Sequence, residues 1–414
     1  MSLRSLALPL LVLLVAAVPV RAAEDAPAPR TSYTLEGTLS LHNSDRAYFQ
    51  PGVANWGEGF ARARVQHALS PALRFEVGGV VMNTMGTDYD GVGDRADGRL
   101  DRLTLTLGDL ERGPSLVVGR QELKIGEGFL IGDGYYDTRA ARWNIPLSFY
   151  DGVTARWNAG KGRVTAFATD YSPSFGDADL GFVPDGLIAG GEVAWTPAEG
   201  HELAVAYLAR DDRSVTKDLT RTWSVRGAAA RGPWSLTSEA VFESGSFDGV
   251  DMAGRGGRLG VTYTHDGPWS PTVRAEYVLL TGDDPGTPED ETYDPWHYTW
   301  NDWSNWYLGD MLGSTVGTWT DMRTALLEVK LSPREGTGLR VLAHRFDRDQ
   351  GKPAPYAWEF DGVLEQSFGE RWSAWIMGAW VTPLERAKLE SGSDQRTTQV
   401  FASVTWRFEG RLGN

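Results

Sequence analysis

The fold is decided by a stretch near the C-terminus, QVFASVTWRF at residues 399–408. Every second residue from Val400 to Phe408 is apolar, and the intervening residues, apart from Phe401, are polar or charged. Successive side chains of a β-strand point to opposite faces, so this alternation predicts a strand with one apolar and one polar face.

The same alternation recurs along the chain after residue 22, and no sustained helical period of apolar residues accompanies it. Clear examples are the runs at 73–81, 102–107 and 273–279. The pattern therefore predicts an all-β protein. We expect eighteen strands, beginning near residues 33, 58, 72, 99, 114, 148, 162, 188, 201, 222, 233, 256, 272, 322, 338, 356, 371 and 398.

The connections between these strands alternate in length. Those after odd-numbered strands are mostly long, and the longest runs from Thr281 to Thr320. Short turns at one rim and long loops at the other are typical of bacterial outer-membrane barrels. We therefore predict a transmembrane antiparallel up-and-down β-barrel of about 18 strands, with short periplasmic turns and long extracellular loops. The short turns after even-numbered strands lie at 69–71, 108–113, 159–161, 197–200, 231–232, 266–271, 332–337 and 369–370.

The N-terminus has the form of a secretory signal peptide. Arg4 is followed by an apolar run over 6–18 and by the small-residue site Val20-Arg21-Ala22. We expect residues 1–22 to be removed and residues 23–414 to form a single outer-membrane barrel domain. Removal of two arginines changes the formal charge from -15 to -17.

The composition excludes several classes of protein. The chain has no cysteine, so it holds no disulfide, no thiolate metal site and no cysteine nucleophile. Its acidic charge makes it a poor binder of nucleic acid, and we expect no such partner. A mean hydropathy of -0.32 argues against a helical membrane bundle.

Motifs of catalysis are missing from the sequence. It contains no HExxH, GxSxG, P-loop or GxGxxG, and its six histidines are scattered singly. We therefore expect no enzyme activity and no cofactor. Asp88, Asp90 and Asp94 are weak calcium candidates, but they lack the ligand order of an EF-hand loop, and an acidic solvated loop is the favoured interpretation.

The segment 281–320 combines eight carboxylates with many aromatic residues and has no Lys or Arg. Two interpretations are open: aromatic rings beside carboxylates can contact a glycan or gate the channel, or they can pack on one another and fold the loop over the barrel mouth. We favour the second. The tryptophans concerned are Trp296, Trp300, Trp303 and Trp306.

If the apolar face of each strand meets lipid, the polar face lines the interior. Our assignment of that face gives twelve basic and eleven acidic residues, so we expect a wet, nearly neutral lumen with ion pairs between strands. Arginine and carboxylate are segregated within it, and charged walls select ions in pores. The basic wall is Arg62, Arg64, Arg74, Arg102, Arg120 and Arg156, and the acidic residues opposite or beside it are Glu328, Glu359, Asp361 and Glu365.

Two short motifs carry a resemblance to a known family. The run 118–123, VGRQEL, followed by 149–153, FYDGV, resembles the alginate-export family of outer-membrane porins, and Glu359-Phe360-Asp361 is similar to a late strand of that family. The resemblance implies a monomeric 18-stranded barrel whose arginine-rich constriction passes an anionic uronate polysaccharide outward, with Arg120 at the matching position. The nearly neutral lumen and the short turn at Gly369-Glu370 depart from the family pattern.

From these patterns we expect an outer-membrane channel that passes anionic polysaccharide or oligosaccharide by passive diffusion. The expected partners are outer-membrane lipid, the anionic glycan and periplasmic export components. The alternative within transport is a general or uptake porin for small acidic solutes. From other classes we keep an outer-membrane lipid hydrolase and a loop-presenting adhesion protein.

Overall fold

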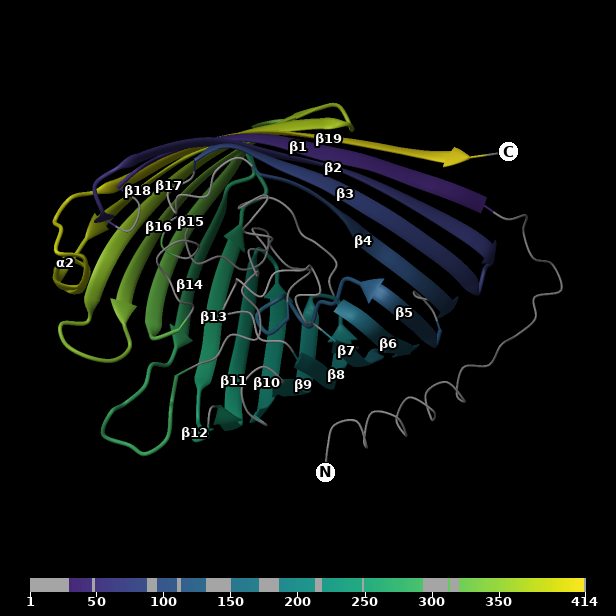
Figure 1. Ribbon diagram of the computed structural model, residues 1–414, viewed down its shortest axis with the longest axis horizontal. Coiled ribbons are helices and arrows are strands. Elements are labelled where there is room, and N and C mark those ends of the chain that lie inside the picture. Colours follow the sequence, from purple (N-terminus) through teal and green to yellow (C-terminus); the bar gives the residue numbers. More distant parts are fainter. Residues whose placement is uncertain are drawn as a thin grey trace.

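The computed structural model describes residues 30–46, 49–87, 95–109, 113–131, 150–170, 186–212, 218–247, 249–292, 312 and 320–412. These residues form a closed antiparallel β-barrel (Figure 1). Its elements are β1 (Arg30–Asp45), β2 (Val53–Ser70), β3 (Leu73–Thr87), β4 (Arg95–Gly108), β5 (Ser115–Gln121), β6 (Tyr150–Ala159), β7 (Gly162–Asp170), β8 (Gly186–Ala198), β9 (His201–Asp212), β10 (Asp218–Arg231), β11 (Trp234–Phe247), β12 (Val250–Met252), β13 (Arg255–Thr264), β14 (Thr272–Leu280), β15 (Met322–Arg334), β16 (Thr337–Arg348), β17 (Pro355–Phe368), β18 (Trp372–Pro383), α2 (Glu385–Ser391) and β19 (Thr397–Leu412).

The barrel closes between its first and last strands. Thr31 lies opposite Leu412 and Asp45 lies opposite Thr398, so β1 and β19 pair along almost their whole length. The short β12 adds to the end of β11, while β11 itself pairs with β13. The wall therefore has 18 strands with one extra strand, which confirms the predicted fold. The largest difference in a strand start is at β2, which begins at Val53 rather than near residue 58.

The outer surface of the wall is apolar. Side chains alternate between buried and exposed along most of the strands, and the exposed set is largely aliphatic or aromatic: Leu41, Val81 and Val341 are each 60% exposed. A continuous apolar surface of this extent is unfavourable in water and is the surface that lipid requires. Tryptophans add to it close to the short turns, at Trp157, Trp195 and Trp234, and nearer the long loops, at Trp223, Trp358 and Trp380.

One irregularity changes which residues face inward. A β-bulge in β4 pairs Arg102 with Gly78 and Leu100 with Gly79, leaving Asp101 as the extra residue. Asp101 is buried, and the alternation reverses beyond it, so Arg99 lies opposite the inward-facing Val80. The bulge therefore places two further charged residues on the inner face.

The described part of the chain has little helix. The helix α2 lies in the connection between β18 and β19 and ends at Gly392, whose φ of 69° is a left-handed conformation that glycine adopts without strain. No helix among the described residues has both the length and the apolar character needed to cross a membrane.

Candidate functional site in the barrel lumen

A segment after β5 crosses the inside of the barrel. Residues 122–131 leave the wall at Gln121 and carry a group of apolar side chains that are almost completely buried. These side chains belong to one buried apolar cluster together with residues of β6 to β9, β11 and β14 to β18 and with Leu312 of the long connection. In Figure 1 the chain after β5 runs inward from the wall. The lumen therefore contains an apolar region. The expectation of a lumen that is wet throughout is not met. The buried side chains are Leu123, Ile125, Phe129, Leu130 and Ile131.

Two contacts fix this segment to the far wall. Glu127 forms an ion pair with Arg258 on β13. Gly126 has a φ of 62°, and a Cβ there would lie 1.9 Å from Nη1 of Arg226 on β10, so the backbone packs directly on that guanidinium. Arg226 is itself held by Glu192 and Glu202, at 2.9 and 2.7 Å. The segment is thus anchored at two neighbouring points of the wall.

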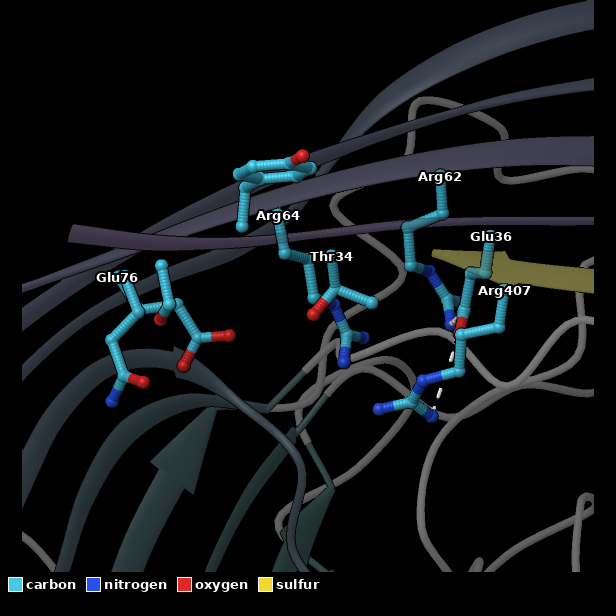
Figure 2. Close-up of a pocket in the computed structure, with 9 residues that line it drawn as sticks. Thr34, Glu36, Arg62, Arg64, Glu76 and Arg407 are labelled. Atoms are coloured by element: carbon cyan, nitrogen blue, oxygen red, sulfur yellow. Dashed lines mark hydrogen bonds and ion pairs between the residues drawn. The ribbon is translucent and has the colours of Figure 1, made fainter. Parts of the chain in front are cut away.

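Arginines gather on the inner face of β1 to β4 and β19. Arg62 is 2.6 Å from Glu36, and Arg64 is 2.7 Å from Asp101. Arg407 approaches Glu36 at 3.9 Å (Figure 2). These groups surround a cavity of about 190 Å³ near the short-turn end of β1 and β2. Its lining is Ser32, Tyr33, Thr34, Glu36, Arg62, Arg64, Gln66, Glu76 and Arg407.

The other predicted members of the basic wall divide into three cases. Arg102 faces inward and pairs with Glu122 at 2.5 Å. Arg74 lies opposite the buried Thr106, and Arg156 opposite the buried Thr165, so both also face inward. Within the described ranges, neither Arg74 nor Arg156 forms an ion pair. Among the described residues they are therefore positive charges in the lumen with no carboxylate in ion-pair contact, although Arg156 interacts electrostatically with Glu192.

The prediction that Arg120 lines the pore is wrong. Residues directly opposite each other in an antiparallel pair point to the same face. Arg120 lies opposite Leu103, which is 42% exposed on the outer face, and opposite Asp151 on β6. Its guanidinium forms two hydrogen bonds to Asp151, at 2.8 and 2.5 Å. Arg120 is an outer-face residue neutralised by its neighbour.

The predicted acidic residues all lie on the inner face. Glu328 accepts a hydrogen bond from Arg340 at 2.8 Å, and Glu365 is 3.8 Å from the same guanidinium. Glu359 and Asp361 are completely buried, and the backbone N–H of Leu312 donates to Glu359 at 2.9 Å. Glu359 therefore contacts Leu312 of the long connection, Asp361 lies 3.7 Å from His344, and neither carboxylate is exposed to a water-filled passage.

Several inner charges were missed from the sequence. Asp101 and Arg99 were missed because the bulge reverses the alternation, and no short pattern marks that bulge. Glu127 was missed because it lies outside the strands, although its place in a Gly-rich run after β5 offered a signal. Arg210, at the long-loop end of β9, is fully buried on the inner face.

Some predicted sites lie outside the described residues. These are the signal peptide at 1–22, the weak calcium candidates and the loop tryptophans. The structure neither supports nor contradicts them. The candidates concerned are Asp88, Asp90, Asp94, Trp296, Trp300, Trp303 and Trp306.

Comparison with known proteins finds the same architecture in solved structures only. No family model matches the chain, and no curated protein matches it. The outer membrane protein OpdK of Pseudomonas aeruginosa, solved with vanillate, aligns at a TM-score of 0.60 with 11% identity, covering 92% of this chain and 99% of that one. OccK5 (OpdH) of the same organism gives 0.57 with 14% identity over 91% and 98%. OccK8 (OprE) gives 0.58 with 13% identity over 94% and 100%.

The likeness at these identities concerns the fold. A closed antiparallel barrel with an apolar outer belt, short turns at one rim and long connections at the other is the architecture of bacterial outer-membrane proteins. The same belt and the same closure are described above for this chain. The chain is a transmembrane β-barrel of the bacterial outer membrane, with the fold of the OpdK and OccK barrels.

Proposed function

We propose that the protein is a passive outer-membrane channel for small acidic solutes. The observation that carries this proposal is the group of inward-facing arginines around the cavity at β1, β2 and β19. A guanidinium binds a carboxylate through two parallel hydrogen bonds, which few other side chains can do. Arg74 and Arg156, which have no ion pair in the described structure, add positive charge on the same inner face.

The size of the cavity favours a small solute. A cavity of about 150 Å³ in another protein is known to hold benzene. The cavity here measures about 190 Å³, so it suits a compact acid of slightly more than benzene size. OpdK, which shares the fold, was solved with vanillate, a small aromatic carboxylate.

The inner segment 122–131 disfavours transport of a polysaccharide chain. A polyuronate chain needs a continuous open path, and this segment occupies the interior with side chains that are at most 2% exposed at Leu123, Ile125 and Phe129. Alginate-type export is therefore the less supported function. We also propose that the barrel acts as a monomer and that residues 1–22 direct its export.

Planar-bilayer recording tests the proposal. The native protein in a potassium benzoate gradient should show a reversal potential of the sign that anion permeation gives. Arg74→Gln and Arg156→Gln together should move that potential toward cation selectivity, while Arg334→Gln, an exposed arginine at the short-turn rim, should leave it unchanged. A folded barrel without conductance would refute the channel. Block by oligouronate with no permeation of benzoate would instead favour polysaccharide transport.

A further inference from the structure

A row of arginines faces outward close to the long-loop rim. Arg221 on β10 and Arg255 on β13 are exposed, and each lies opposite an outward-facing residue of β11, Ser244 and Phe242 respectively. Two strand spacings across the sheet and two residues along it separate them, roughly 12 Å. On the next part of the wall, Arg323 of β15 has the same orientation, opposite Leu279. The row therefore follows one section of the circumference.

The row borders aromatic side chains of the lipid-facing belt. Trp223 is two residues from Arg221 toward the short turns, about 7 Å along the strand. Trp223 and Phe242 are each 52% exposed, and they lie opposite each other. Aromatic rings of this kind sit at the level of the lipid headgroups. The guanidinium of Arg221, just beyond these rings, is thus at the level of headgroup phosphates, and Arg255 lies beside Phe242 at the edge of the same zone.

The charges of this row differ in how they are compensated. Arg323 is 2.7 Å from Asp349. Arg345 of β16 continues the row, since it lies opposite the outward-facing Trp358 and stacks over it at 5.2 Å, and it is 2.9 Å from Asp347. Arg221 and Arg255 form no ion pair within 4 Å with any residue in the described ranges, although Arg255 lies near enough to Glu291 to interact with its carboxylate electrostatically. Among the arginines of the row, these two are therefore the ones whose guanidinium groups are not held by a carboxylate contact.

The opposite side of the barrel has a different surface at the same rim. There the outward positions of β1 and β2 carry Asn43 and Asn55, which hydrogen-bond to each other at 2.6 Å. These amides carry no positive charge. Arg46, just after β1, is also partly exposed at this rim, but it is paired with Asp45 at 2.6 Å, so the two parts of the rim differ in how their arginines are compensated.

We infer that Arg221 and Arg255 form a binding patch for the phosphate groups of the glycolipid in the outer leaflet, with Trp223 and Phe242 packing on its acyl chains. Long connections of outer-membrane barrels face the cell exterior, so this rim contacts the outer leaflet. Guanidinium binds phosphate through paired charge-assisted hydrogen bonds. The patch is separate from the lumen, and it does not depend on the proposed transport function.

Lipid binding to detergent-purified protein tests this inference. Lipopolysaccharide added to delipidated native protein should raise its melting temperature, and native mass spectrometry should show the bound glycolipid. Arg221→Gln with Arg255→Gln should lower the bound amount at least threefold and remove most of the thermal shift. Asn43→Ala with Asn55→Ala is the matched rim control and should behave like the native protein.

Three outcomes would overturn the inference. The arginine variant could bind as much lipopolysaccharide as the native protein. The asparagine control could lose as much lipopolysaccharide binding as the arginine variant is expected to lose. Phosphatidylglycerol could raise the melting temperature as much as lipopolysaccharide does. Circular dichroism of each variant establishes that the barrel is folded. The two single variants provide a second measurement, and each should lose part of the binding.

Discussion

The apolar inner segment leads to a prediction about pore size. Phe129 is 2% exposed and belongs to the cluster that joins residues 123–131 to the inner wall. Truncating a packed phenylalanine to alanine costs about 3–5 kcal/mol. If that loss falls on the docking of the segment, the ratio of docked to undocked states falls roughly a hundredfold to a few thousandfold, since about 1.4 kcal/mol is tenfold.

Phe129→Ala should therefore widen the channel while leaving the wall intact. Single-channel conductance should rise or switch between two levels, and liposome swelling should admit larger neutral sugars than the native protein admits. The wall pairs are unaffected by the change, so the β-sheet signal in circular dichroism should be retained.

Leu105→Ala is the matched control, because Leu105 is an apolar residue of the neighbouring β4 that faces outward. It should leave conductance and size limit unchanged. An unaltered conductance and size limit in Phe129→Ala, with the barrel folded, would refute the argument that this segment restricts the lumen.

Three further predictions concern single charges. Arg120→Gln should leave ion selectivity unchanged, because this side chain faces outward. Arg156→Gln alone should shift the reversal potential toward cation selectivity, because Arg156 faces the lumen. Equal shifts in the two variants would contradict the strand register that places these two residues on opposite faces. Asp101→Asn removes the buried charged partner of Arg62 and Arg64 and should lower the free energy of unfolding by about 3–5 kcal/mol. Urea denaturation in detergent measures this loss, and a loss below about 1 kcal/mol would contradict the role of Asp101 as their stabilising partner. Partial burial acts to raise the pKa of Glu390, but hydrogen bonds from Arg386 and Arg348 hold that pKa below its ordinary value. The stability that these hydrogen bonds give to α2 is therefore present above the ordinary carboxyl pKa, and it is lost as the pH falls through the lowered pKa of Glu390. The protection factors of the α2 amides, which compare the observed exchange rate with the intrinsic rate at each pH, should fall on acidification, and Glu390→Gln should remove that fall; protection factors that do not change with pH in the native protein would refute it.

The sequence predicted the wall well because its signal is repeated. Each strand must present apolar side chains to lipid, so the alternation recurs at every strand, and the turns at 159–161 and 231–232 interrupt it sharply. Errors of a few residues in one strand do not alter the architecture. The strand count and the unequal connections are therefore set by local patterns.

The lumen was less predictable, since its geometry depends on irregularities and on contacts between distant residues. The bulge at Asp101 adds one residue and reverses the inner and outer faces beyond it. Arg120 was assigned to the inner face from the polar alternation, as were the other basic residues of the wall, yet its partner Leu103 places it outside. The contact of Glu127 with Arg258 joins residues 131 positions apart, and no alternation in the sequence records such a pair.

The seam between β1 and β19 constrains how the barrel can be made. Its two strands are the first and the last of the described chain, so the wall cannot close until synthesis has reached the final strand. Until then, both β1 and the most recently synthesised strand have an unpaired edge. Lipid does not tolerate such edges, and they invite pairing with other chains. Insertion into the membrane must therefore follow completion of the chain, and loss of residues from Thr397 onward would leave an unclosed sheet with no stable place in the bilayer.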